Sequence, residues 1–193
     1  MFQKDLSNLG WSEVKRRQVQ RLPLVKDWIQ LSEMTTGSHV IDVGPGPGVF
    51  TREYAITVGD TGKIYAIEKS PEAVEYLRRE LEGLSNVDVY LADAEQGLDS
   101  ILVVPDIVIL SDVLHHTDSP GKIIQVVYAS VSRHSRVLVA EYDPTAAGLM
   151  GPPLENRIHR ESLIDMAEKA GFVIDRVGIQ EYEHYYLLLR ARK

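Results

Sequence analysis

VIDVGPGPGVFT, residues 40–51, joins a short apolar run to a helix-length segment through three glycines in five residues. An apolar run that ends in a glycine-rich turn predicts a buried strand followed by a helix, because glycine lets the backbone turn sharply and approach a ligand closely. In an open parallel sheet such a turn lies at the carboxyl ends of the strands, where ligands bind. We therefore expect a ligand-binding loop built on Gly44, Gly46 and Gly48.

Apolar runs of strand length recur on both sides of helix-length segments. The runs are residues 39–43, 63–68, 87–92, 106–111 and 136–142, and the segments between them are 49–57, 72–82, 95–102 and 121–132. The runs are continuous rather than alternating, as in strands that are covered on both faces. Ser70-Pro71 and Ser119-Pro120 are typical cap and first-turn pairs. The pattern predicts an α/β fold with a doubly wound, Rossmann-like, mostly parallel sheet.

The C-terminal part predicts an antiparallel end to this sheet. Residues 143–157 contain two glycines and three prolines and read as a long loop, and residues 161–170 read as a helix. The apolar segments 172–179 and 181–192 follow with only Gln180 between them, too short a connection for a crossover helix. We expect a hairpin here, which gives seven strands in all. Arg157, His159 and Arg160 follow the loop and could touch a substrate, but an ordinary surface position is the favoured interpretation.

The N-terminal part predicts two helices between Trp11 and Met34, the second beginning near Pro23. This piece is too short for a core of its own. We expect residues 1–34 to form a helical extension docked on a domain of residues 35–193. Four basic residues of this extension could form a stripe on one helix face, although such clusters are usually solvated. They are Lys15, Arg16, Arg17 and Arg21.

Composition excludes several classes of function. The chain has 193 residues, a net charge of −7 and no cysteine. Disulfides, thiolate zinc sites and cysteine nucleophiles are therefore excluded, and the negative charge makes a nucleic-acid partner unlikely. No apolar run is long enough to span a bilayer, and the N-terminus lacks the apolar segment of a signal peptide. We expect a cytoplasmic location.

Spacing and charge favour one of two ligands that fit such a loop. A dinucleotide fingerprint needs a third glycine at position 49, but the chain has Val49 there and glycine one residue earlier. Pro45 and Pro47 also remove two backbone N–H groups that could bind a diphosphate. Asp42 would repel that diphosphate and attract a cation. S-adenosylmethionine presents an ammonium and a sulfonium, so the loop favours it over NAD.

Acidic residues at the next two strand ends fit the rest of this ligand. Glu68 could accept hydrogen bonds from both ribose hydroxyls, although NAD enzymes share this feature and a solvated carboxylate is the alternative. Asp93 could accept from the adenine amine while the N–H of Ala94 faces a ring nitrogen. Helix capping is an equally good interpretation of Asp93.

The motifs VIDVGPGPGVFT, AIEKS, LADAE and DIVILSDVLHH together resemble those of the class I methyltransferases. They are similar in particular to a broad branch that includes ubiquinone and menaquinone biosynthesis enzymes. The resemblance covers residues 38–141 and hardly touches the N-terminal helices. It implies that the glycines pass under the methionine moiety, Glu68 holds the ribose, Asp93 and Ala94 meet the adenine, and Ser111 lies near the amino-acid end. The cofactor-binding candidates are Asp42, Gly44, Pro45, Gly46, Gly48, Glu68, Lys69, Asp93, Ala94 and Ser111.

Methyl transfer is an in-line displacement that needs alignment and the exclusion of water, not a covalent catalyst. A phenol or enol acceptor also needs a base, for which His115 and His116 are the candidates. Capping or packing is the alternative role of these histidines. Asp112 and Asp143 could bind magnesium, but solvated or capping carboxylates are the favoured interpretation, and we predict no metal.

The residues after the fourth strand run Ser-Asp-Val-Leu, residues 111–114, where enzymes that methylate planar amino groups commonly have Asn/Asp-Pro-Pro-aromatic. This difference disfavours amino methylation of DNA or glutamine. The leading hypothesis is a methyltransferase with a small-molecule acceptor. A protein or RNA methyltransferase that uses the basic stripe, a non-catalytic S-adenosylmethionine-binding module and an NAD-dependent oxidoreductase are the alternatives. The sequence leaves the acceptor and the oligomeric state open.

Overall fold

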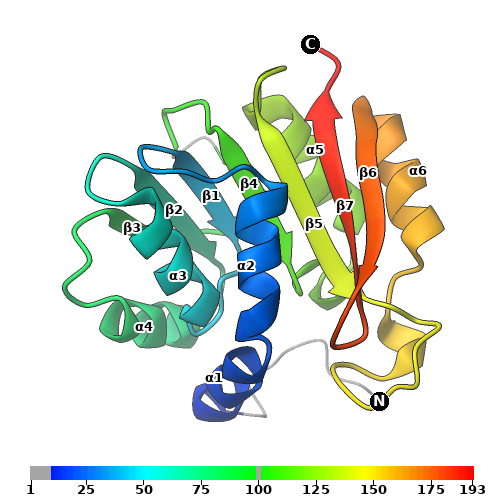
Figure 1. Cartoon of the computed structure of the whole chain (residues 1–193), viewed down its shortest axis with the longest axis horizontal. Helices are drawn as coiled ribbons and strands as arrows, with labels where there is room; N and C mark the ends of the chain where they lie inside the picture. Colours follow the sequence, from blue (N-terminus) through cyan, green and yellow to red (C-terminus); the bar gives the residue numbers. More distant parts are fainter. Residues whose placement is uncertain (1–9, 99–100) are drawn as a thin grey trace.

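The computed structural model describes residues 10–98 and 101–193, which fold around one seven-stranded sheet (Figure 1). The strand order is β3-β2-β1-β4-β5-β7-β6. The strands are β1 (His39–Val43), β2 (Lys63–Glu68), β3 (Val87–Leu91), β4 (Ile107–Ser111), β5 (Arg136–Tyr142), β6 (Phe172–Gln180) and β7 (His184–Ala191). The helices are α1 (Trp11–Gln20), α2 (Leu22–Leu31), α3 (Val49–Val58), α4 (Pro71–Glu80), α5 (Pro120–Ser130) and α6 (Arg160–Ala170). The predicted α/β, mostly parallel, seven-stranded fold is confirmed.

Helices cover both faces of the sheet, as the continuous apolar runs predicted. On one face Val40, Ile64 and Ile109 pack against α2 and α3, and α4 covers Ala66 of the same face. On the other face residues of opposite parity, such as Ile41, pack against α5 and α6. Figure 1 shows α2 in front of the sheet and α5 and α6 behind it. This sandwich places the carboxyl ends of β1, β2, β3 and β4 at one edge of the sheet.

The C-terminal hairpin forms as predicted, and β7 enters the sheet between β5 and β6. β7 is antiparallel to both neighbours, with Leu138 opposite Leu188 on one side and Val177 opposite Leu187 on the other. Chain reversal after Gln180 is tight, and Tyr182 and Glu183 take positive φ values of 57° and 60° there. The hairpin therefore returns the chain beside β5 without a crossover helix.

The N-terminal helices pack on the sheet through α2. Leu24, Val25 and Trp28 of α2 are at most 2% exposed, and they share a core with α3. The indole Nε1 of Trp28 donates a hydrogen bond of 3.0 Å to Oε1 of Gln180 at the end of β6. α1 lies beside the carboxyl ends of the parallel strands. Division into an extension of residues 1–34 and a domain of residues 35–193 stays a prediction.

The expected helix over residues 95–102 is wrong in the part that the structure describes. Residues 94–96 form a turn, in which Oδ1 of Asp93 accepts the N–H of Glu95 at 2.9 Å. Gly97 follows with a φ of 129°, outside the helical region. The side chain of Asp93 thus closes a short turn. No helix follows, because Gly97 leaves the helical conformation directly after this turn. Residues 99–100 lie outside the described residues.

Two other helices were predicted to begin at a serine–proline pair, and the serine side chain caps only one of them. Ser70 precedes α4 and its Oγ accepts the N–H of Ala73 at 3.3 Å, so this cap is confirmed. Ser119 occupies the same position before Pro120 of α5, but its side chain makes no cap hydrogen bond. Among the described residues, no helix combines the length and the apolar character needed to cross a bilayer.

Gly48 offers a direct test of the packing that fixes the start of α3. It has a φ of 85°, and a Cβ there would lie 2.4 Å from Cδ1 of Leu77, which is fully buried. Gly83 has a φ of 87° and open space around a Cβ. Because both alanines carry the same backbone strain, we expect Gly48→Ala to destabilise the protein more than Gly83→Ala, by about 1–3 kcal/mol from overpacking. Urea denaturation of the two variants measures the difference; equal losses would contradict the packing described.

Candidate active site

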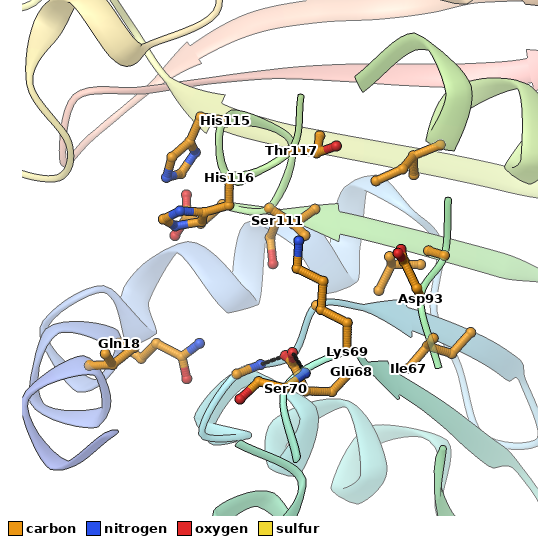
Figure 2. Close-up of a pocket in the computed structure, with 18 of the residues that line it drawn as sticks. Gln18, Ile67, Glu68, Lys69, Ser70, Asp93, Ser111, His115, His116 and Thr117 are labelled. Carbon is orange, nitrogen blue, oxygen red and sulfur yellow. Dashed lines mark hydrogen bonds between the residues drawn. The ribbon is translucent and has the colours of Figure 1, made fainter. Parts of the chain in front are cut away.

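A cavity of about 1080 Å³ lies at the carboxyl ends of the parallel strands (Figure 2). Its walls come from the turn after β1, the ends of β2, β3 and β4, the helix α1 and the loop after β5. The residues that line it include Trp11, Gln18, Arg21, Gly44, Gly46, Glu68, Lys69, Asp93, Ala94, Ser111, Asp112, His115, His116 and Tyr142. Most of the sequence-predicted site residues therefore meet at one cavity.

The glycine turn passes close to the loop after β4. Gly44 has a φ of 68°, and a Cβ there would lie 2.3 Å from Cγ2 of Val113. Its N–H donates to the carbonyl of Ile67 at 2.8 Å, which carries the β1–β2 pairing into the turn. Val113 is β-branched and cannot rotate away easily, so only glycine fits at position 44.

Glu68 binds the glycine turn through one carboxylate oxygen and the residue before α4 through the other. Oε2 accepts the N–H of Gly46 at 3.2 Å, and Oε1 accepts the N–H of Ser70 at 2.9 Å (Figure 2). Burial raises the pKa of this carboxyl, while the hydrogen bonds from Ser70 and Gly46 partly oppose the rise. Glu68 thus shapes the turn and still lines the cavity, where its oxygens can meet hydroxyl groups.

Asp42 lies behind the turn rather than in the wall of the cavity. Its Oδ2 accepts the hydroxyl hydrogen of Thr51 on α3 at 2.7 Å. Burial raises its pKa to about 7, with the charge of Glu68 adding to the rise and the Thr51 bond opposing it. Pro45 and Gly48 also fall outside the lining residues. These three predicted residues support the turn from within, and a direct contact of theirs with the cofactor stays a prediction.

The remaining cofactor candidates line the cavity. Asp93 and Ala94 follow β3, and Ser111 ends β4. Lys69 follows β2, and Figure 2 shows its side chain crossing toward Ser111. Asp93 also holds the turn described above, and its contact with the adenine stays a prediction. The hydroxyl of Thr117 bonds to Glu95, which links the loops after β4 and β3 beside Asp93.

Gln18 of α1 is a site residue that the sequence reasoning missed. Its Nε2 donates to the carbonyl of Pro45 at 3.1 Å, and its Oε1 accepts the N–H of Val49 at 3.2 Å. The side chain is buried and lines the cavity. A glutamine on a helix with three arginine or lysine neighbours gave no signal of this role. α1 is therefore fastened to both ends of the glycine turn.

His115 forms a buried pair with Glu141. Glu141, like Gln18, is a site residue that the sequence reasoning missed. Nδ1 of His115 lies 2.6 Å from Oε2 of Glu141, and the other carboxylate oxygen accepts the N–H of Leu114 at 2.7 Å. Burial alone would lower the pKa of His115, but the charge and hydrogen bond of Glu141, helped by Asp112, outweigh it and raise the pKa. Nδ1 then carries a proton for Glu141, which leaves Nε2 for other partners.

Aromatic rings surround this pair. The rings of His115 and His116 have centroids 4.0 Å apart, and both histidines belong to the short 3-10 helix Leu114–His116 after β4. The ring of Tyr142, at the end of β5, meets His115 edge to face with a centroid distance of 5.9 Å. Both predicted histidines thus lie at the cavity, with Tyr142 beside them.

Asp112 and Asp143 do not come together as metal ligands. Asp112 pairs with Arg21 at 3.1 Å and with Nε2 of His184 at 2.8 Å. Oδ1 of Asp143 instead accepts bonds from the backbone and hydroxyl of Thr145. Within residues 10–98 and 101–193, no group of three or more histidines or acids could hold a metal ion.

The segment after β5 is anchored by Arg157, for which the favoured surface interpretation is wrong. Its side chain is fully buried, donates to the carbonyls of Pro152 and Asp143 at 3.0 and 2.8 Å, and pairs with Glu183 at 2.9 Å. Gly151 and Pro152 line the cavity as a result. His159 precedes α6 and Arg160 pairs with Glu161, and neither lines the cavity. The long loop is thus a wall of the site held by one arginine.

Strand order, glycine turn and carboxylate after β2 together define a Rossmann-like cofactor-binding domain of the methyltransferase type. A family model described as a methyltransferase domain matches residues 34–183. The crystal structure of an S-adenosylmethionine-dependent methyltransferase from Aquifex aeolicus shares the fold, with a TM-score of 0.82 and 22% identity over 93% of this chain and 97% of that one. The chain therefore belongs to the class I S-adenosylmethionine-dependent methyltransferase domain family.

Curated relatives differ in their acceptors. A probable cobalt-precorrin-6B C(15)-methyltransferase (decarboxylating) of Sulfolobus acidocaldarius is 33% identical over 89 residues, which are 42% of this chain and 46% of that protein. A protein-L-isoaspartate O-methyltransferase of Methanothrix thermoacetophila is 30% identical over 129 residues, 63% of this chain and 61% of that protein. The chain thus spans less than two thirds of either relative. Neither of these two relatives is named as a ubiquinone or menaquinone biosynthesis enzyme.

Gln18 gives a prediction about cofactor binding. Gln18→Ala removes two hydrogen bonds that hold the turn, each worth about 1 kcal/mol, so we expect S-adenosylhomocysteine to bind about 30-fold more weakly. Gln20→Ala, an exposed glutamine on the same helix, is the matched control and should bind as the wild type does. Isothermal titration calorimetry measures both. Unchanged affinity in Gln18→Ala would show that α1 does not hold the binding form of the turn.

Proposed function

We propose that this chain transfers a methyl group from S-adenosylmethionine to a small-molecule acceptor bound beside His115, and that His115 takes up the acceptor's proton. The observation that carries the proposal is the buried His115–Glu141 pair, joined at 2.6 Å, at the end of the cofactor cavity. The carboxylate holds the imidazole in one tautomer and orientation, an arrangement that suits a general base.

The proposed reaction needs little beyond alignment. S-adenosylmethionine supplies a methyl carbon that is already activated by a positive sulfur. Nε2 of His115 accepts the hydroxyl proton of a phenol or enol, the acceptor oxygen bonds to the methyl carbon, and the carbon–sulfur bond breaks to leave a neutral thioether. Tyr142 and His116 provide flat aromatic rings for an unsaturated acceptor, and the wall held by Arg157 closes one side of the site.

The environment of the basic stripe supports a small molecule over RNA. Lys15 pairs with Glu80 at 2.6 Å, and Arg16 and Arg17 both pair with Glu13 at 2.8 and 2.9 Å. Arg21 is buried against Asp112. Since each cation has a carboxylate partner, no free basic row remains on this helix for a phosphate backbone. The motif resemblance to ubiquinone and menaquinone biosynthesis enzymes also favours a small acceptor.

A protein acceptor is the second candidate, because one curated relative is a protein-L-isoaspartate O-methyltransferase. Labelled S-adenosylmethionine incubated separately with a metabolite extract and with a protein extract distinguishes the two. Transfer to the metabolites supports the proposal, whereas transfer to protein alone, or to neither pool, would contradict it.

The His115–Glu141 pair predicts a characteristic pH dependence. A base must be unprotonated to act, and its raised pKa means that kcat/KM should increase with pH through a value above 6.5 and then level off. His115→Gln should lower kcat by about 100-fold or more, the usual contribution of a general base. Glu141→Gln removes the charge that raises the pKa, so its rising limb should move to lower pH and its plateau should fall.

His134 is exposed, so His134→Gln is the matched control and should keep the wild-type pH profile. Affinity for S-adenosylhomocysteine, measured on the same samples, shows whether the variants keep the cofactor site. If His115→Gln turns over at the wild-type rate, or if the profile is unchanged in Glu141→Gln, the histidine is not the base.

A further inference from the structure

Arg21 places a buried guanidinium in the wall of the acceptor end of the cavity. The residue is 7% exposed and lines the cavity together with Tyr142 and His115. Its central carbon lies 5.3 Å from the centroid of the Tyr142 ring and 5.8 Å from that of Phe50. Aromatic rings interact with the faces of a guanidinium, so its N–H groups are left to find partners in its own plane.

The protein does not provide all of these partners. Nη2 of Arg21 lies 3.1 Å from Oδ2 of Asp112, but this oxygen makes no well-formed hydrogen bond within the described part of the chain. Nε of Arg21 is buried and also has no hydrogen-bond partner among the described residues. A buried donor without a partner costs stability, which is unusual unless the group serves a ligand.

Asp112 is also engaged by a second side chain. Nδ1 of His184 lies 2.7 Å from the carbonyl oxygen of Tyr182, and Nε2 lies 2.8 Å from Oδ1 of Asp112. Asp112 is therefore shared between His184 and Arg21, and its carboxylate does not serve the guanidinium alone.

Other charges nearby are already engaged. Both oxygens of Glu141 accept hydrogen bonds, from Leu114 and from His115. Arg157 lies 5.2 Å from the Tyr142 ring and is paired with Glu183. Arg21 is thus the cation of this group whose N–H groups lack a full set of partners among the described residues, and it lines the cavity together with Asp112.

We propose that Arg21 binds a carboxylate of the acceptor, so that the small molecule methylated by this chain is a hydroxy acid with an unsaturated or aryl frame. Arginine's planar fork matches a carboxylate. A carboxylate supplies an acceptor for the N–H group that the described residues leave without a partner, whereas a dianion would place a second negative charge beside Asp112 and Glu141. This inference rests on the proposed function, because it names the acceptor class for the same site.

Binding and turnover are measured separately to test it. The probes are hydroxybenzoates and hydroxycinnamates, each paired with its neutral amide, and a hydroxyphenyl phosphate as the dianion. Titration of each probe into the protein saturated with S-adenosylhomocysteine should show acids binding at least about tenfold more tightly than their amides. Arg21→Gln should remove this preference, and Arg21→Lys, which keeps the charge, should retain part of it.

Arg133→Gln, an exposed arginine in the turn before β5, is the control and should keep the full preference. Affinity for S-adenosylhomocysteine reports whether each Arg21 variant keeps its fold, and the lysine variant serves if the glutamine variant does not. Equal binding of acids and amides, binding of none of the probes, preference for the phosphate, or an acid preference that survives in Arg21→Gln would each overturn the inference.

Turnover with labelled donor then tests the proposed function on its own. Transfer to acids and amides alike would keep the methyltransferase proposal and reject the carboxylate site. Tight binding of acids without transfer to any of them would keep the carboxylate site and count against methyl transfer.

Discussion

The turn between β1 and α3 has no room for a side chain at Gly44 or Gly48, and the rest of the site is arranged around this constraint. A Cβ at Gly44 would meet Val113 and a Cβ at Gly48 would meet Leu77, so the turn is packed between the loop after β4 and the helix α4. Glu68 and Gln18 bind the same turn from β2 and α1. Four separate parts of the chain thus depend on the backbone path of five residues.

This arrangement divides the cavity into two electrostatic halves. Near the turn the carboxylates of Asp42 and Glu68 are buried, and burial raises the pKa of both, which favours a cationic ligand that would stabilise their charged forms. Beyond Ser111, the guanidinium of Arg21 lines the cavity, and Asp112 and Glu141 are engaged by Arg21, His184 and His115. A cationic methyl donor would thus meet buried carboxylates in one half, and an anionic acceptor would meet Arg21 in the other.

Sequence patterns predicted what depends on local order along the chain. All five predicted parallel strands, the hairpin and the main helices appear, because continuous apolar runs and proline or glycine boundaries report burial and chain direction directly. The helix expected over residues 95–102 failed because Asp93 and Gly97 close a turn that apolar spacing does not reveal.

The sequence could not predict hydrogen bonds between site residues that are far apart along the chain. Gln18 and Pro45 are 27 residues apart, His115 and Glu141 are 26 apart, and His184 and Asp112 are 72 apart. Such pairs form only when strand order brings distant ends together, and one sequence does not encode that order in any local pattern. Buried Arg157 belongs to the same group, since its role depends on how the loop after β5 folds back on itself.

The central claim is that the cavity beside the glycine turn accepts a cationic sulfonium compound and rejects a diphosphate. A calorimetric titration of the same protein sample with S-adenosylmethionine and with NADH tests it most directly. The account predicts saturable one-to-one binding of S-adenosylmethionine and no measurable heat from NADH. Binding of NADH at this site, with no response to S-adenosylmethionine, would contradict it.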